Sequence, residues 1–505
     1  MRDCDVVVIG AGNGGLAAAA ALQRKGLRTV LLERHNIPGG AATSFVRGDF
    51  EFEVALHQLS GVGTEESPFM LRQFFDEVGL SERVTLVEEH ELYRYIVPGL
   101  IDITLPADMR GIARVLSERF PAESQAIEDY LQACALIALE FYVLLPQVRR
   151  TNDPAALAAK CPTFVKHGMR SCRAVLDDFF QDETLKAVLL GYWGYLGMPG
   201  SALPFAELAG MFYMYAEHKP WHVVGGSQAL SNALVDAFQE AGGEIHFNTA
   251  ATRIHTRNGA VSGVSTAAGE RISCRAVVSN ASSVHTYTEL LDLDQPPEQI
   301  RQEFMQSRTG VSGVIVYMGL YCPPEDLGIT AASTFINTTL DDDAVHDQGY
   351  TLAPPMGALL TSYTTAHRSF SPPGKTNASL MSLQYSAPWE ALDPAEYAAT
   401  KYRFAQDLLA LAEQAFPGLR DHIEEMEVAT PLTVMRYMNT PGGAIYGFQQ
   451  TEIQSIPLER KPLAIDGLYL VGAWATIGGF QSTYHSGQFT ARAVARRFEK
   501  EGFAA

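Results

Sequence analysis

A glycine-rich turn between a strand-forming run and a helix-forming run constrains this chain more than any other feature. Residues 4–9 (CDVVVI) are typical of a buried parallel strand, and residues 16–25 (LAAAAALQRK) favour a helix. The segment between them has the G-x-G-x-x-G spacing of a dinucleotide-binding turn. Such a turn needs glycine for its tight bend, for the approach of a pyrophosphate and for close helix–strand packing. The predicted contacts are Gly10, Gly12, Asn13, Gly14 and Gly15.

An acidic residue follows at the distance that a dinucleotide-binding unit requires. Residues 28–32 (RTVLL) predict a second strand, and Glu33 ends it, roughly 20 residues after the glycines. Its carboxylate can accept hydrogen bonds from a ribose diol, while the free N–H groups at the start of the helix favour phosphate. Because strand, glycines, helix, strand and acid occur in this order, a nucleotide site is favoured over an ordinary structural turn.

A second glycine-rich turn lies just beyond the acidic residue. Glu33-Arg34, a short gap, and then Gly39-Gly40 with a small hydroxyl residue form a pattern that resembles the flavoprotein family of carotenoid desaturases, carotenoid isomerases, retinol saturases and amine oxidases. The resemblance implies FAD as the cofactor, with this turn close to its flavin end. An ordinary surface turn is the alternative. The implied contacts are Arg34, Gly39, Gly40, Ala41, Ala42 and Thr43.

The C-terminal part carries a second motif of the same family. Residues 441–447 (PGGAIYG) resemble a segment of its carotenoid and retinoid branch, and a predicted strand at 467–471 precedes a glycine-punctuated loop at 472–479. In the family, this loop and the helix after it lie against the pyrimidine end of the flavin, where a helix N-terminus stabilises negative charge. The implied contacts are Gly472, Ala473, Gly479, Phe480, Gln481 and Ser482, with Ala251 near the adenine and Asn280 after a returning strand.

The resemblance and the pattern of elements predict an α/β fold with two parts. A Rossmann-type FAD-binding domain, with a parallel sheet and a β-meander, is expected from residues 1–65, 221–290 and 425–505. A mixed α+β substrate domain is expected from two insertions. Residues 66–220 form its helical lid, and residues 291–424 form its antiparallel sheet.

Shorter patterns predict single elements of these domains. Residues 92–97 and 101–105 favour a hairpin that interrupts the helices of the lid. Ser227 is expected to cap a helix that runs to about Ala241. Residues 276–279 (AVVS) predict one more buried strand.

Three side chains are candidates for catalysis, because each lies in or beside a segment expected near the flavin. His57 lies in a stretch, residues 48–59, that is similar to the family segment in which a buried acidic residue, a small residue and sometimes His precede the flavin. The matching residues are Glu53, Ala55 and His57, and a structural histidine is the alternative. Tyr446 can donate a hydrogen bond or stack on a ring. His485 falls within the last predicted helix, where simple packing would also explain it.

The composition disfavours several classes of function. The net charge is −19 and no basic cluster is evident, which argues against nucleic-acid binding and against attraction of the whole surface to anionic lipid. The six cysteines form no C-x-x-C pair, so neither a metal site nor a disulfide framework is expected. No apolar run reaches the roughly 18 residues of a membrane span, and the N-terminus leaves no room for a secretory signal. A cytoplasmic protein is therefore expected.

Two apolar segments leave a peripheral membrane contact open. Residues 133–148 (ACALIALEFYVLLPQV) and 205–216 (FAELAGMFYMYA) are unusually apolar for surface helices. Core packing is one explanation, and a lipid-facing lid or the wall of a hydrophobic tunnel is the other.

The chemistry is expected to be that of the flavin. The sequence shows no Ser-His-Asp arrangement and no second G-x-G-x-x-G unit, so hydride or electron exchange at N5 with a substrate held over the ring is implied. The resemblance implies an FAD-dependent oxidoreductase that desaturates, saturates or isomerises C–C double bonds of a hydrophobic polyene or isoprenoid-type substrate.

Three alternatives stay open. An FAD-dependent oxidase of amines or other small molecules shares the scaffold, although the absence of Lys from residues 467–499 disfavours it. A non-catalytic FAD-bearing scaffold is left open by Ala473 and Ile477, where many relatives have Asp and Pro. A plain NAD dehydrogenase is disfavoured by Gly39-Gly40.

Overall fold

The computed structural model describes residues 2–148, 153–450 and 465–502 of the chain. One sheet has five parallel strands in the order β10-β3-β2-β14-β20. Because β3 lies on one side of β2 and β14 on the other, the strand order reverses beside β2, and the carboxyl ends of these strands border a crevice. The strands are β2 (Val6–Ile9), β3 (Thr29–Leu32), β10 (Glu244–His246), β14 (Ala276–Ser279) and β20 (Leu468–Leu470).

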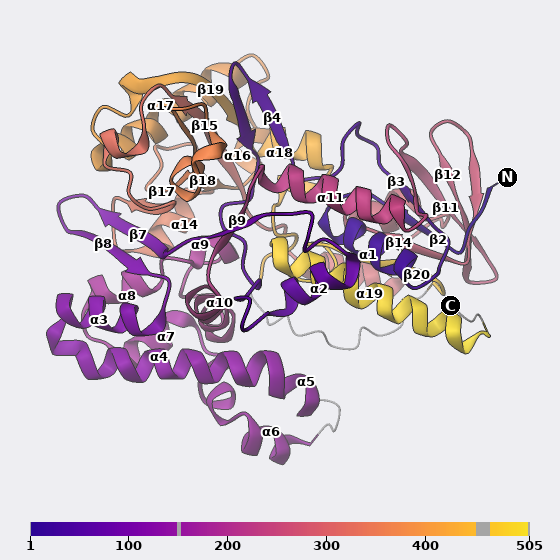
Figure 1. The fold of residues 1–505 in the computed structure, drawn as a ribbon, viewed down its shortest axis with the longest axis horizontal. Coiled ribbons are helices and arrows are strands. Elements are labelled where there is room, and N and C mark those ends of the chain that lie inside the picture. The colour runs from indigo at the N-terminus through magenta and orange to yellow at the C-terminus, as the bar shows by residue number, and fades with distance from the viewer. Residues whose placement is uncertain (1, 149–152, 451–464, 503–505) are drawn as a thin grey trace.

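Different structures cover the two faces of this sheet, as the alternation of side chains along a strand allows. Val6 and Val8 of β2 pack with the helices in one apolar core, whereas Val7 and Ile9 pack with a β-meander in another. Figure 1 shows these helices and the strands of the meander beside the sheet. The helices are α1 (Asn13–Arg24), α2 (Met70–Val78), α11 (Gly226–Glu240) and α19 (Phe480–Lys500), and the meander is β11 (Ala251–Arg257), β12 (Ala260–Thr266) and β13 (Arg271–Ser273).

A second, mixed sheet has seven strands and is backed by helix α17 (Tyr397–Ala415). The hairpin predicted at residues 92–97 and 101–105 is present, but it does not lie apart among the lid helices: β7 pairs in parallel with β16 and so joins this sheet. The predicted domain start at residue 425 falls inside β19, which pairs with β15. The strands are β7 (Glu91–Val97), β8 (Ile101–Pro106), β15 (Ser312–Leu320), β16 (Ser333–Asn337), β17 (Gly357–Ser362), β18 (Thr376–Gln384) and β19 (Ile423–Ala429).

The helical insertion forms one end of the molecule (Figure 1). Among the described residues, one helix, Pro121–Val148, is long and apolar enough to cross a membrane by length and composition alone, and 50% of its most apolar window is buried against the protein. Within it, the π-helical turn η2 (Glu140–Leu144) separates α4 from α5. The principal helices are α3 (Met109–Arg119), α4 (Ser124–Leu139), α5 (Leu145–Val148), α7 (Cys172–Phe179), α8 (Glu183–Leu189) and α10 (Phe205–His218).

Helix α11 begins against a buried carboxylate and not at the predicted serine cap. Its N-cap residue is Gly225, and no side chain of its own caps it. The Ser227 backbone N–H donates to Glu53 Oε2 over 2.7 Å, and the Ser227 hydroxyl donates to Glu53 Oε1 over 2.6 Å. Glu53 comes from β5 (Phe50–Glu53) and supplies acceptor oxygens to the start of the helix, where backbone N–H groups lack intrahelical partners. The prediction for Ser227 was therefore wrong, because a residue distant in sequence provides the cap.

Helices α1 and α19 meet at glycines. A Cβ placed on Gly487 of α19 would overlap the Gly14 carbonyl oxygen of α1 and lie 2.8 Å from the Ala17 Cβ. The absence of a side chain at Gly487 therefore lets the starts of both helices lie at the same edge of the parallel sheet.

We expect Gly487→Ala to destabilise the protein by about 2 kcal/mol, because the added methyl group forces two packed helices apart. The matched control is Gly194→Ala, where the nearest atom to the new Cβ is 3.7 Å away, on Leu383. Urea denaturation of both variants measures the effect. Equal midpoints for the two variants would contradict the close-packing account.

Candidate FAD-binding and catalytic site

The first glycine turn has the geometry that its spacing predicts. Gly10 directly follows β2, has φ of +91°, and donates its N–H to the Leu32 carbonyl oxygen over 2.8 Å. A Cβ on Gly15 would overlap the Gly10 carbonyl oxygen, so the turn tolerates no side chain there. Gly12 is the N-cap of α1, and neither a side-chain cap nor an acidic residue occupies the first turn of this helix. The N–H groups at the start of α1 thus remain available to an anion.

Asn280 lies where three of the glycines converge. It follows β14 and donates its backbone N–H to the Ile9 carbonyl oxygen over 2.8 Å. A Cβ on Gly12 would lie 2.7 Å from Asn280 Nδ2, one on Gly14 would lie 2.7 Å from Asn280 Oδ1, and one on Gly472 would overlap that same oxygen. The predicted residues after β2, β14 and β20 therefore form one close-packed edge.

Glu33 is buried beside the glycine turn. Its Oε2 accepts the Ala11 N–H over 2.7 Å, and its Oε1 accepts the His35 N–H over 2.8 Å. Each oxygen keeps a second lone pair, so the carboxylate can still accept from a diol. Arg34 is exposed, and its guanidinium donates to the backbone carbonyls of Arg436 and Tyr437.

The second glycine turn is braced against the first. Gly39 donates its N–H to the Ala11 carbonyl oxygen over 2.8 Å, and it has φ of +116°. The Ala42 carbonyl accepts from the hydroxyl of Ser231 over 2.8 Å, and the Thr43 hydroxyl donates to Gln228 Oε1 over 2.6 Å. Both partners belong to α11, so this turn lies between the starts of α1 and α11.

The C-terminal loop places a second helix start at the same edge. Helix α19 begins at Phe480 after Gly479, without a side-chain cap and without an acidic residue in its first turn. Gln481 Oε1 accepts from the Ser60 hydroxyl over 2.7 Å. Ala473 lies beside Gly447, because a Cβ on Gly447 would be 2.5 Å from the Ala473 carbonyl oxygen. The loop thereby contacts the segment that carries Tyr446.

These residues fit an FAD cofactor. Two helix starts without acidic residues and a glycine cradle suit a pyrophosphate. The buried Asn13 Oδ1, at the first residue of α1, has no hydrogen-bond partner among the described residues, so it can accept from a ligand. No cluster of metal-ligating side chains occurs in the described part of the chain.

His57 belongs to the loop after β5 and contacts the seven-stranded sheet. Its Nδ1 is 3.0 Å from the Thr361 hydroxyl and 3.5 Å from the Tyr363 hydroxyl. Its ring lies roughly parallel to that of Tyr195, with 6.3 Å between the ring centroids. Burial lowers the pKa of His57 to about 4, with a smaller effect from nearby His222. The imidazole is therefore neutral at physiological pH.

Tyr446 bridges the C-terminal loop and the helical insertion. A Cβ on Gly478 would lie 2.5 Å from the Tyr446 Cα, and one on Gly197 would lie 3.3 Å from its ring. Burial raises the pKa of Tyr446 well above its usual range, so the phenol stays protonated. Tyr195, whose ring faces His57, lies in α9 (Trp193–Leu196), and Gly197 at the end of this helix lies beside the Tyr446 ring, so both candidates adjoin the same part of the helical insertion.

His485 is packed within α19. Its side chain is 7% exposed, and neither ring nitrogen has a hydrogen-bond partner of good geometry among the described residues. Its ring stacks on Phe489 at 5.8 Å between centroids. Burial lowers the pKa of His485 to about 4. These contacts are those of a packed histidine, and none of them involves His57 or Tyr446.

A buried polar network behind His57 was not predicted. Gln58 Nε2 donates to Glu89 Oε2 over 2.8 Å, and Gln58 Oε1 accepts from the Tyr192 hydroxyl over 3.0 Å. His222 Nε2 lies 3.1 Å from Glu89 Oε1, and both side chains are almost fully buried. The sequence holds no local signal for this network, because its members come from separate elements.

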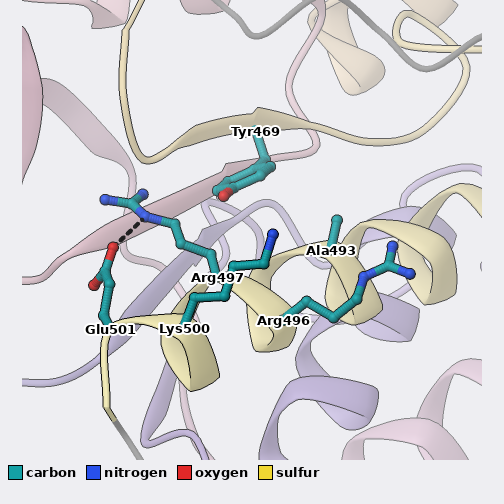
Figure 2. A pocket seen from close by; sticks show the side chains of 6 residues that line it. All are labelled: Tyr469, Ala493, Arg496, Arg497, Lys500 and Glu501. Atoms are coloured by element: carbon teal, nitrogen blue, oxygen red, sulfur yellow. Dashed lines mark hydrogen bonds and ion pairs between the residues drawn. The ribbon is translucent and has the colours of Figure 1, made fainter.

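A surface hollow at the other end of α19 is a different feature. It has a volume of about 470 Å³ and is lined by Tyr469, Arg496, Arg497 and Lys500, among others (Figure 2). At 1.5 Å per residue, it lies roughly 25 Å along the helix from Phe480. Arg497 is already paired with Glu501. This hollow is therefore separate from the glycine edge, the sheet edge formed by the two glycine turns, Asn280 and the start of α19.

The fold and this edge define a dinucleotide-binding flavoprotein. A family model described as flavin containing amine oxidoreductase matches residues 14–495. The chain belongs to this family, it is an oxidoreductase, and its cofactor is FAD. The predicted α/β fold with a Rossmann-type domain is confirmed.

Relatives of known activity cover almost the whole chain. All-trans-retinol 13,14-reductase from Danio rerio is 25% identical over 95% of this chain and 84% of its own length. Prolycopene isomerase from Daucus carota is 24% identical over 93% of this chain and 76% of its own length. Phytoene desaturase (lycopene-forming) from Paracoccus sp. is 25% identical over 97% of this chain and 96% of its own length. These relatives confirm the resemblance inferred from the two glycine turns.

Solved structures share the fold. An oxidoreductase from Methanosarcina mazei is 19% identical with a TM-score of 0.66, and covers 97% of this chain and 100% of its own. Putrescine oxidase with bound putrescine is 16% identical with a TM-score of 0.63, and covers 98% of this chain and 99% of its own. At these identities the likeness concerns the fold alone.

We expect His485→Leu to make the protein less sensitive to acid. The unfolded chain binds a proton at His485 as the pH falls below about 6.5, whereas the folded chain does so only near pH 4. Between pH 7 and pH 5, the wild type should therefore lose about 2 kcal/mol more unfolding free energy than the variant. Urea denaturation at both pH values measures this difference, and equal losses would contradict it.

Proposed function

We propose that this chain uses FAD to desaturate, saturate or isomerise C–C double bonds of a hydrophobic polyene or isoprenoid-type substrate. The supporting observation is that three enzymes named for retinol, prolycopene and phytoene match 93% or more of the chain. The bound cofactor supplies hydride or electron exchange at its N5 atom. The chain's own residues hold the cofactor, orient the substrate and keep water out.

The cofactor-binding roles follow from the glycine edge. The start of α1 at Gly12, Asn13 and Gly14 would hold the pyrophosphate, while Glu33 would hold the ribose. Ala251 would contact the adenine, and Arg34 would support the turn next to Glu33. Residues 39–43 would lie near the flavin end, and the loop and helix start at Gly472, Ala473, Gly479, Phe480, Gln481 and Ser482 would face its pyrimidine ring.

His57 and Tyr446 would contact the substrate over the flavin. His57 is neutral and Tyr446 is protonated, so each can donate one hydrogen bond without introducing a charge into an apolar cavity. His485 packs inside α19 and shares no contact with these two side chains, but both of its ring nitrogens are without a hydrogen-bond partner among the described residues, so its catalytic role stays a prediction.

Oxidation of amines is the second candidate. Tyr192, Tyr195 and Tyr215 form a ring cluster, with 5.0 Å between the centroids of the first two and 5.1 Å between those of Tyr192 and Tyr215. A ring face at the border of such a cluster can bind a cation. A small amine that bleaches the flavin absorbance, where no polyene does so, would favour this candidate.

Anaerobic visible spectroscopy of the FAD-loaded protein tests the leading proposal. If the enzyme is a desaturase, added polyene should remove the oxidised-flavin band and yield a product two hydrogens poorer. After dithionite reduction, a saturase should restore that band and yield a product two hydrogens richer. An isomerase should return a product of unchanged mass. No flavin band after reconstitution with FAD, or no conversion of any polyene in either state, would contradict the proposal.

The lid surface supports a proposal of peripheral membrane contact. The side chains of Leu139, Val143, Val165 and Met169 are 46% to 58% exposed. Their segments adjoin, since Glu140 accepts the Phe164 N–H over 2.5 Å. Residues 145–175 contain six Lys and Arg but one Asp, and two of these cations, Arg170 and Arg173, are paired with acidic residues outside this range. Apolar side chains next to basic ones suit an anionic lipid surface.

We expect the double variant Leu139→Gln and Val143→Gln to lose flotation with vesicles that contain phosphatidylserine, because it removes apolar area from the lipid-facing surface. The matched control is Met305→Gln, which alters an apolar side chain that is 86% exposed on another helix, α13 (Glu298–Gln306). Equal flotation of both variants, or none by the wild type, would contradict the membrane contact.

A further inference from the structure

Hydroxyl groups gather on one face of the seven-stranded sheet, around His57. Thr361 of β17, Ser379 of β18 and Tyr363 of α15 (Tyr363–Ala366) are all fully or almost fully buried. The Thr361 hydroxyl lies 3.0 Å from His57 Nδ1, and the Tyr363 hydroxyl lies 3.3 Å from the Ser379 hydroxyl. These groups form a polar cluster in a region where a purely apolar substrate would favour apolar side chains.

The alternation along the strands shows which face carries this cluster. Ala358 and Leu360 of β17 pack in the core that backs the sheet with α17, so Thr361 faces the opposite side. In β18, Ala378 and Leu380 belong to that same core, so Ser379 also faces away from α17. The polar cluster therefore lies on the face that meets the loop carrying His57.

One nitrogen of His57 is left for a ligand. Nδ1 is occupied by the hydroxyls of Thr361 and Tyr363, whereas no hydrogen bond to Nε2 is present among the described residues. The His57 side chain is half-buried, although it lies deep in the protein. An imidazole with one nitrogen fixed by a neighbour presents the other in a defined direction.

A pure hydrocarbon would be a poor match for this nitrogen. Covering an imidazole nitrogen with an apolar group removes its water without replacing the hydrogen bond, and such an unpaired polar group opposes binding. A ligand oxygen would restore the hydrogen bond. Sites built to hydrogen-bond a substrate group discriminate strongly against the analogue that lacks it.

We infer that His57 Nε2, fixed by Thr361 and Tyr363, is the subsite for a terminal oxygen of the substrate. The substrate is then an isoprenoid that carries a hydroxyl or carbonyl group at one end, and not an unsubstituted carotene. This inference rests on the proposed function, because it assumes that an isoprenoid occupies the site. It adds a hydrogen bond and no chemical step.

Two probes that differ in one oxygen test the subsite in the FAD-loaded protein. They are all-trans-retinol and its deoxy analogue, in which CH₃ replaces CH₂OH. We expect the wild type to bind the alcohol at least tenfold more tightly, measured as dissociation constants from the change in flavin absorbance. Equal affinities, or tighter binding of the analogue, would overturn the subsite and leave the proposed function intact. If neither probe binds and no polyene is converted, both fail.

Two isosteric variants localise the effect. Thr361→Val removes the hydroxyl next to His57 and should reduce the preference for the alcohol by about tenfold, since Nδ1 loses its partner. Thr334→Val is the matched control. Thr334 is equally buried in neighbouring β16, but it lies on the same face of the sheet as Ile336, which packs toward α17 and away from His57. An unchanged preference in Thr361→Val, with retained FAD, would contradict the role of this hydroxyl.

Discussion

The structure depends on a close approach of backbone at one edge of the parallel sheet. Gly12, Gly14 and Gly472 all lie against Asn280, and a methyl group at any of these glycines would overlap or crowd its amide. The absence of side chains brings the start of α1 to the carboxyl ends of β2 and β14, and α19 starts at the same edge. Two helix dipoles then converge at this edge, where we propose that the anionic cofactor binds, and the first turn of each helix is free of competing carboxylates.

A buried carboxylate connects this edge to the rest of the molecule. Glu53 accepts from the backbone of Ala55, Leu56 and Ser227, and from the hydroxyl of Ser227. Burial raises the pKa of Glu53, and its hydrogen bonds oppose that shift. The loop that Glu53 stabilises then presents His57 to the sheet, Gln58 to the lid and Ser60 to α19. One short segment therefore contacts the start of α19, the seven-stranded sheet and the helical insertion.

The site combines an apolar setting with a few placed polar groups. Its aromatic rings come from the lid, and its hydroxyls come from the sheet. In such a setting a single hydrogen bond discriminates between ligands more sharply than additional apolar area does, since a buried polar group left unpaired is costly. Ala473 and Ile477 occupy loop positions where the family resemblance implies Asp and Pro, and the glycines of the loop and the start of α19 are in place.

The sequence by itself determined the glycine turn, the place of Glu33 after the second strand, and the strand at 276–279. Strand, turn and helix signals act over a few residues, and the tight bend of the turn admits glycine alone. It also identified Asn280, through a family pattern. Only the tertiary structure decided that Glu53 caps α11, that the hairpin at 92–105 completes a sheet with β16, and that Thr361 fixes His57. Glu53 and Ser227 are 174 positions apart, and Thr361 and His57 are 304 apart. Contacts at such separations depend on which packed surfaces meet, and no local pattern of residues encodes that.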